Sequence, residues 1–136
     1  MIKISFVYFF LAFSIRADSN YELKLYEKVL PLIFNSKHIN IYVDSSTKKV
    51  FNKSLIFHTQ ESCTDADLII IKKGILIIDT CKNMPMFALD YRSYKNNQNS
   101  VGVFYWRKGR PQLTLNKIAI EKFNLNLPIS LKKYTQ

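Results

Sequence analysis

Near the middle of the chain stands the stretch Ala66-Asp67-Leu68-Ile69-Ile70-Ile71, which ends in a continuous apolar run. A run without polar alternation is typical of a strand that is covered on both faces, as in parallel sheets. Helical and strand patterns alternate along the chain on both sides of this run. We therefore expect an α/β fold, a single compact three-layer sandwich with a mixed sheet.

Ahead of the run, hydrophobic periodicity separates helices from strands. The expected elements are a helix over 20–35, a strand over 39–43, a short helix over 45–53 and a strand over 55–58. Ser19 and Glu22 have the spacing of a capping box, which predicts that the first helix begins here.

Behind the run, Lys72-Lys73-Gly74 predicts a turn that returns the chain as a hairpin strand over 75–78. Further on, the pattern predicts a strand over 86–89, a helix over 91–97, a strand over 101–106, a turn over 107–111, its return over 112–115, and a helix that begins at Asn116. The fold should therefore close on a C-terminal β-hairpin plus helix.

The N-terminus has the form of a secretory signal peptide. A positive start at Lys3 is followed by an apolar run over 4–15, with small residues at cleavage positions near Ser14 or Ala17. The run is shorter than the roughly 20 residues that a membrane-spanning helix needs, and the alternative to a signal peptide is an uncleaved interfacial anchor. We expect a signal peptide over 1–17, a single α/β domain over 18–136, and a periplasmic or secreted protein that is not integral to a membrane after cleavage.

The only two cysteines are Cys63 and Cys81. In an oxidising compartment an isolated pair predicts a disulfide, and the alternative is two buried free thiols. With only His58 near them in sequence and no metal-binding motif, the pair does not indicate a metal site, and no cofactor motif is present.

The expected working surface is the hairpin turn near the C-terminal end. Trp106 leads directly into Arg107, Lys108 and Arg110, which suit an anion or the acidic surface of a partner. The alternatives are that Trp106 is a half-buried core anchor and that the basic residues only keep a strand end soluble. The formal charge of +10 would favour nucleic acid in a cytosolic protein, but export argues against that partner.

No catalytic motif is recognisable. Three glycines cannot supply a phosphate loop or a dinucleotide fingerprint, and no nucleophile elbow is present. We therefore expect a protein that is not an enzyme. A second hypothesis is a small-ligand or anion-binding protein related to periplasmic substrate-binding domains, which would use strand ends near Asp44, Asp65 and Asp90.

The run from Val103 to Asn116 resembles the closing hairpin of the YfiR-type periplasmic family. Residues 118–131 are similar to that family's last helix, and residues 63–71 to its acidic lead-in to a central strand. The chain lacks the Trp-Pro pair that follows the first helix in the family, and it has one cysteine pair where members can have two. For Asn116 and the hairpin, the resemblance implies a structural role in closing the sheet.

The family resemblance implies a compact α/β domain like half of a periplasmic binding protein. Members bind or restrain the sensor domain of an inner-membrane diguanylate cyclase. The sequence therefore predicts an exported, non-enzymatic regulatory or sensing module that binds a partner protein, such as the sensor domain of a membrane signalling protein. The sequence does not predict the oligomeric state.

Overall fold

The structure, a computed structural model, describes residues 21–136. The predicted signal peptide over 1–17 and the predicted cap at Ser19 lie outside these residues. Within them, no helix is long and apolar enough to cross a bilayer.

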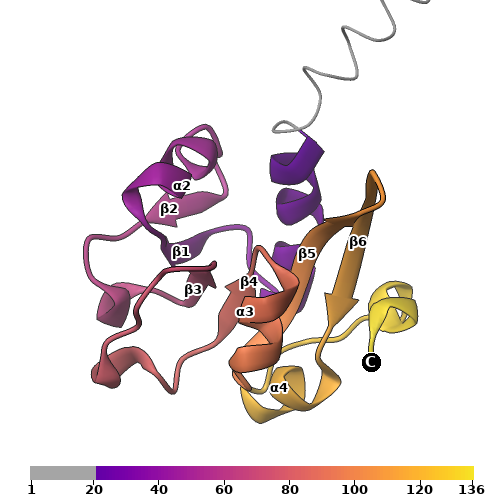
Figure 1. Cartoon of the computed structure of the whole chain (residues 1–136). Coiled ribbons are helices and arrows are strands. Elements are labelled where there is room, and N and C mark those ends of the chain that lie inside the picture. Colours follow the sequence, from indigo (N-terminus) through magenta and orange to yellow (C-terminus); the bar gives the residue numbers. More distant parts are fainter. Residues whose placement is uncertain (1–20) are drawn as a thin grey trace, which may run out of the picture.

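Six strands form one mixed sheet in the order β2-β1-β3-β4-β5-β6. Strands β1 to β5 all run parallel to one another, and β6 at the edge is antiparallel to β5. The strands are β1 (Ile39–Tyr42), β2 (Phe57–Thr59), β3 (Leu68–Ile71), β4 (Met86–Ala88), β5 (Ser100–Arg107) and β6 (Arg110–Leu115). Figure 1 shows the sheet and its helices.

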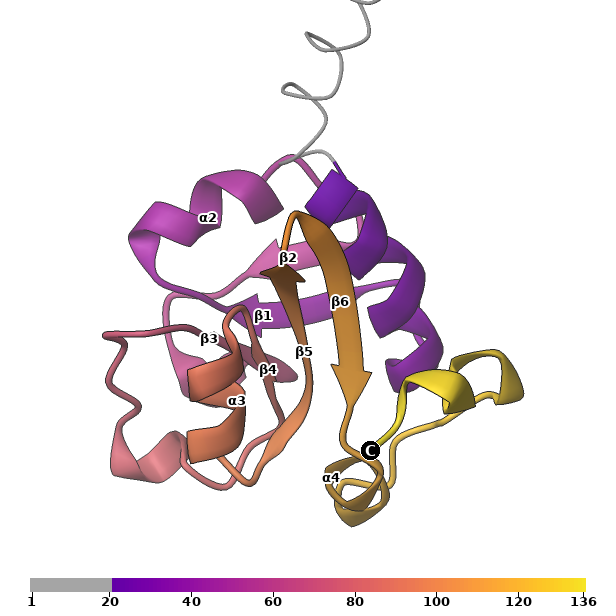
Figure 2. The ribbon, with the colours of Figure 1, turned by 45° about the vertical axis from the view of Figure 1, so that its right-hand side comes forward.

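Helical segments cover both faces of this sheet. They are a helix over 21–34, α2 (Ser45–Phe51), η1 (Cys63–Asp65), η2 (Asp79–Cys81), α3 (Tyr91–Asn96), α4 (Lys117–Lys122) and η3 (Ile129–Tyr134), where η marks a 3₁₀ helix. The helix over 21–34 lies across one face, while α3 lies on the other (Figures 1 and 2). The predicted α/β sandwich with its mixed sheet is confirmed.

Two apolar clusters fill the space between the layers. The larger cluster packs Tyr26, Leu30 and Ile33 of the first helix against the sheet, together with Phe51 of α2 and Ile120 of α4. The smaller cluster lies on the opposite face and joins alternate β3 residues to the two cysteines and to α3. All four residues of β3 are buried, which is why this strand reads as an unbroken apolar run.

The elements at the C-terminal end of the sheet form where the sequence predicts them. Asn116 caps α4, because its side-chain oxygen accepts a hydrogen bond from the Ala119 N–H at 3.2 Å. Its own N–H donates to the carbonyl of Val101 in β5, so this residue ties α4 to the sheet. The C-terminal hairpin followed by a helix is therefore confirmed.

The predicted hairpin strand over 75–78 is wrong. These residues form no strand, although Gly74 does adopt the positive φ (+87°) expected of a turn. The reason is topological, since β3 already pairs with β1 on one edge and with β4 on the other. A returning strand would find no free hydrogen-bonding edge on β3, and the chain instead crosses the face of the sheet to reach β4.

Cys63 and Cys81 lie at disulfide distance, with their Cα atoms 6.2 Å apart. Cys63 belongs to η1, in the segment that leads into β3, and Cys81 to η2, in the segment that leaves it. Both are buried against the sheet. A bond between them ties together the two irregular connections that flank the central strand.

We expect that replacing both cysteines with alanine will lower the free energy of unfolding by about 3 kcal/mol, because the bond restricts a loop of the unfolded chain. Denaturant unfolding of the variant and of the parent protein would measure this loss. Thiol labelling of the unfolded, unreduced parent protein should find no free thiol. Two labelled cysteines would contradict the bond.

Candidate functional site

The turn between β5 and β6 places the predicted basic residues at the tip of the sheet. Lys108 and Gly109 both adopt positive φ (52° and 76°), which closes the hairpin directly between the paired residues Arg107 and Arg110. All of these turn residues are exposed. Among residues 21–136, no acidic side chain forms an ion pair with Arg107, Lys108 or Arg110.

Trp106 is fixed beside this turn and remains partly open to solvent. Its indole Nε1–H donates to Glu22 Oε1 at 2.8 Å, and its ring packs edge-on against Phe104. Tyr21 contributes a tilted ring whose centroid is 6.2 Å from that of Trp106. With 42% of its surface exposed, Trp106 both anchors the hairpin to the first helix and offers an aromatic face.

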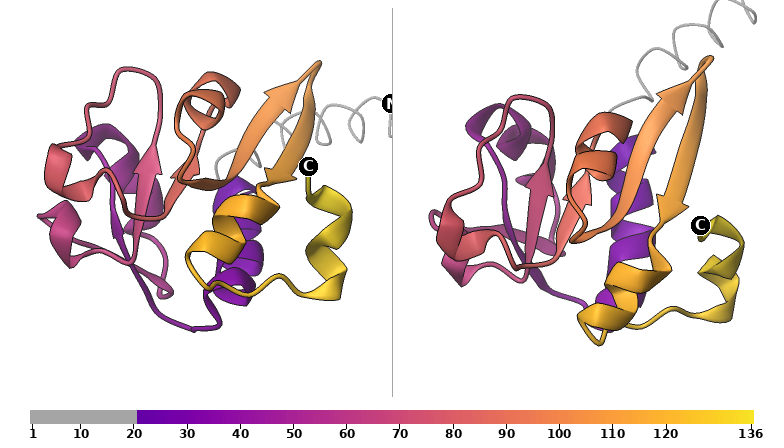
Figure 3. Two further views of the ribbon diagram at one scale, coloured as in Figure 1. Left: turned by 90° about the horizontal axis from the view of Figure 1, so that it is seen from below. Right: turned by 60° about the horizontal axis from the view of Figure 1, so that its bottom comes forward.

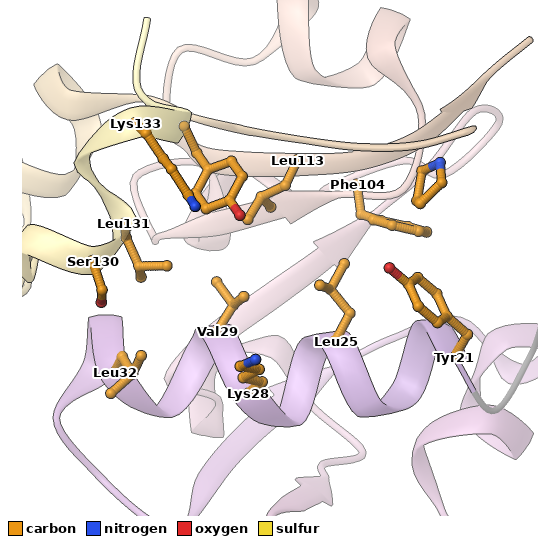
Figure 4. Close-up of a pocket in the computed structure, with 12 residues that line it drawn as sticks. Tyr21, Leu25, Lys28, Val29, Leu32, Phe104, Leu113, Ser130, Leu131 and Lys133 are labelled. Atoms are coloured by element: carbon orange, nitrogen blue, oxygen red, sulfur yellow. The ribbon is translucent and has the colours of Figure 1, made fainter.

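An apolar groove runs from this aromatic cluster toward the C-terminus. It has a volume of about 360 Å³ and lies between the first helix, the β5–β6 hairpin and the segment 130–134. Figure 4 shows Leu25 and Val29 pointing from the helix toward Leu113, with Leu131 from η3 beside them. Lys28 and Lys133 also line the groove. The groove can therefore receive an apolar group and places two cations beside it.

The predicted strand-end site is only partly assembled. Asp44 follows β1 and Asp90 follows β4, so both lie at the carboxyl edge of the parallel strands, where α/β proteins commonly bind ligands. Asp65 instead lies in η1, ahead of the amino end of β3. The carboxylate of Asp90 is already occupied, because it accepts hydrogen bonds from Ser93 and from the Lys73 N–H.

Asp44 is held as a carboxylate by a small polar cluster. The Lys72 ammonium lies 3.3 Å from Asp44 Oδ2 and donates to Ser46 Oγ at 2.8 Å, while the Ser46 hydroxyl donates to Asp44. Burial raises the pKa of Asp44, but the hydrogen bonds from Ser46, Thr47 and Lys72 outweigh that effect and lower the pKa to about 2. This arrangement stabilises a negative charge, which does not favour binding of an anion here.

The structure also brings together residues that sequence reasoning treated separately. His38, directly before β1, and His58 in β2 lie side by side, with Nδ1 of His38 3.3 Å from Nε2 of His58. Within residues 21–136, no group of three or more metal-ligating side chains gathers around them or elsewhere. The groove was missed as well, because its walls come from the two ends of the described chain and no local pattern connects them.

Comparisons with known proteins leave the family open. No family model matches the chain, and no curated protein matches it. Among solved structures, it is similar to a conserved domain protein from Vibrio cholerae O1 biovar El Tor strain N16961, with 14% identity and a TM-score of 0.49 over 87% of this chain and 60% of that one. The chain thus spans less than two thirds of that protein. The YfiR-type resemblance stays a prediction.

The Asp44–Lys72 pair gives a prediction about pH. In the Lys72→Met variant, the pKa of Asp44 should rise toward the ordinary value of 3.8, because the ammonium no longer favours the carboxylate. In the parent protein, stability from this lowered pKa is present above the ordinary pKa of the unfolded chain and is lost as the pH falls toward 2. Carboxyl NMR titration would measure the pKa.

The control for this titration is Lys82→Met. Lys82 hydrogen-bonds Asp79 and lowers its pKa, so this variant should raise the pKa of Asp79 and leave that of Asp44 unchanged. An Asp44 pKa that stays near 2 without Lys72 would show that Ser46 and Thr47 alone hold the carboxylate.

Proposed function

We propose that this protein is an exported, non-enzymatic regulatory module that binds an acidic surface of a partner protein through its β5–β6 hairpin. The observation that carries the proposal is the concentration of Arg107, Lys108 and Arg110 at one exposed turn with no ion-pair partner among residues 21–136. Four lysines elsewhere do have such partners. The hairpin therefore presents positive charge that the described part of the chain does not neutralise.

The chemistry of the tip favours carboxylates. A guanidinium group forms two parallel hydrogen bonds with one carboxylate, and such charge-assisted pairs are stronger than neutral ones. Arg107 and Arg110 are cross-strand partners, so they project from adjacent positions of the same turn. Two neighbouring acidic side chains on a partner would match them.

Trp106 and Tyr21 supply an apolar anchor next to the charges. Binding energy at protein interfaces concentrates in Trp, Tyr and Arg residues that are packed together. Trp106 is preorganised by its hydrogen bond to Glu22, so it would lose little conformational freedom on binding. The groove behind it can take an apolar side chain of the same partner, which extends the contact from the tip toward Lys28 and Lys133.

The partner that we propose is another exported domain, such as the sensor domain of a membrane signalling protein. A cysteine pair at disulfide distance is compatible with an oxidising compartment. The predicted signal peptide and the YfiR-type resemblance of residues 103–116 point to the same setting. In this proposal the protein regulates by occupying its partner's surface, without a chemical reaction of its own.

The second candidate is a small-ligand or anion-binding protein, and the groove favours it. A cavity of about 360 Å³ with mostly apolar walls falls within the size range of small-molecule sites. A ligand with an apolar body and an acidic head would place its charge beside Lys28 or Lys133. The strand-end acids support this candidate less, because Asp65 lies apart and Asp90 already accepts three hydrogen bonds within the chain.

Charge reversal at the hairpin tests the first candidate. Replacing Arg107, Lys108 and Arg110 with glutamate should abolish capture of the partner, because the tip would then repel acidic groups. Thermal stability should change little, since these side chains are exposed. The measurement is capture from membrane extract by the tagged protein, with the bound proteins identified by mass spectrometry.

The matched control reverses three exposed lysines that also have no ion pair among residues 21–136, namely Lys37, Lys49 and Lys53. It changes the net charge equally and should preserve capture. Equal loss of capture in both variants would show that capture depends on net charge and not on the hairpin. If the parent protein captures nothing even after gentle crosslinking, the small-ligand candidate is favoured.

A further inference from the structure

The connection that leaves β3 exposes large aliphatic side chains. After Lys72-Lys73-Gly74 the chain runs over 75–78 without helix or strand, and Leu76 is 93% exposed while Ile78 is 60% exposed. Isolated apolar residues are common on protein surfaces, but two on one loop beside a charged patch indicate contact with something apolar. The inferred contact is separate from the hairpin and does not depend on the function proposed for it.

A basic hollow adjoins this loop on the face that carries α3. It has a volume of about 570 Å³ and lies between the β3–β4 connection and the segment 92–99. Its lining includes four basic side chains and no acidic one. The basic residues are Lys72, Lys73, Lys82 and Arg92, and the amides of Asn96, Asn97, Gln98 and Asn99 complete the polar wall.

Part of this charge is not neutralised. Lys72 pairs with Asp44 and Lys82 with Asp79, but Lys73 and Arg92 have no ion-pair partner among residues 21–136. Of the acids nearby, Asp90 accepts hydrogen bonds from the Lys73 N–H and from Ser93, and Glu61 pairs with Lys48. The hollow therefore keeps a positive potential next to exposed apolar side chains.

We propose that the loop over 72–78 and the adjoining hollow dock the protein onto an anionic lipid surface. Leu76 and Ile78 enter the boundary between headgroups and acyl chains, while Lys73 and Arg92 face the phosphates. Stable peripheral attachment needs two signals of this kind, because buried apolar area and attraction to anionic lipids are each weak alone. The structure places both signals on one surface.

The apolar side chains favour lipid over a soluble anion. A phosphate or a small polar anion in the hollow would contact the basic and amide groups but would leave Leu76 and Ile78 in water. A lipid surface satisfies both sets of groups at once. A protein partner at this loop is the competing occupant, and vesicles that contain no protein distinguish the two.

The docked orientation keeps the hairpin accessible. In both views of Figure 3 the β3–β4 connection and the β5–β6 turn project beyond the same edge of the sheet, well apart from each other. A protein attached by the loop would hold Arg107 and Arg110 close to the lipid surface. At that position the hairpin would meet the part of a membrane protein that emerges from the bilayer.

The experiment measures co-sedimentation with vesicles of phosphatidylcholine, with and without phosphatidylglycerol. It uses the protein in the form isolated from cells, and because all variants share one N-terminus, any contribution of residues 1–17 is common to them. We expect binding only to the anionic vesicles, with weakening as salt rises. Replacing Leu76 and Ile78 with serine should reduce the partition coefficient about tenfold or more.

Two control variants sharpen the result. Leu55→Ser with Ile129→Ser removes two exposed aliphatic side chains elsewhere on the surface (86% and 84% exposed), and it should leave binding unchanged. Lys73→Glu with Arg92→Glu should strongly weaken binding to the anionic vesicles while leaving thermal stability unchanged, since both side chains are exposed.

Several outcomes would overturn the proposal. Vesicle binding that is unaffected by the Leu76 and Ile78 substitutions would remove the loop from the contact. Binding of soluble glycerol phosphate in the hollow, with no sedimentation on anionic vesicles, would assign the hollow to a soluble anion. Absence of vesicle binding together with protein capture that needs Leu76 would assign the loop to a protein partner. Each result is independent of partner capture by the hairpin.

Discussion

Parallel pairing on both edges of β3 is the constraint from which the rest of the structure follows. A chain that forms parallel neighbours must return across a face of the sheet each time, usually by a helix. Here the two returns that flank β3, over 60–67 and 72–85, contain only the short 3₁₀ helices η1 and η2. The pair Cys63 and Cys81 ties these helices together and packs them beside α3 on β3. A covalent link between them would take the place of the apolar area that two longer helices would have buried.

The short connections and the antiparallel last strand also explain where the exposed charged and apolar groups lie. The connection after β3 is too irregular to bury all its aliphatic residues, so Leu76 and Ile78 remain outside the core while Cys81 is fully buried. At the β6 end of the strand order, the chain turns back directly after β5 to form the antiparallel strand β6. This turn places Arg107 and Arg110 beyond the packed layers. Both surfaces arise at the carboxyl edge, because that is where the chain leaves the parallel strands.

Local patterns were sufficient for most elements and insufficient for the sites. The apolar run of β3, the alternation in β1 and the cap at Asn116 each depend on neighbouring residues, so periodicity and capping rules predict them. The run over 75–78 has strand composition as well, and only the pairing of β3 with β1 and β4 shows that it cannot join the sheet there. The hairpin tip was predictable because its residues are consecutive. The groove was not, since its walls combine the first helix with the β5–β6 hairpin and the segment 130–134, which are far apart in the sequence.

The distribution of charge and apolar surface indicates how such a basic protein could choose its contacts. A formal charge of +10 attracts many anionic surfaces, so charge by itself gives speed of association and little selectivity. Selectivity must then come from shape and apolar matching. The hairpin tip adjoins Trp106 and the groove, and the basic hollow adjoins Leu76 and Ile78. In each place the positive charges would attract an anionic surface. The neighbouring apolar groups would then stabilise the contact only if that surface offers apolar groups to pack against them.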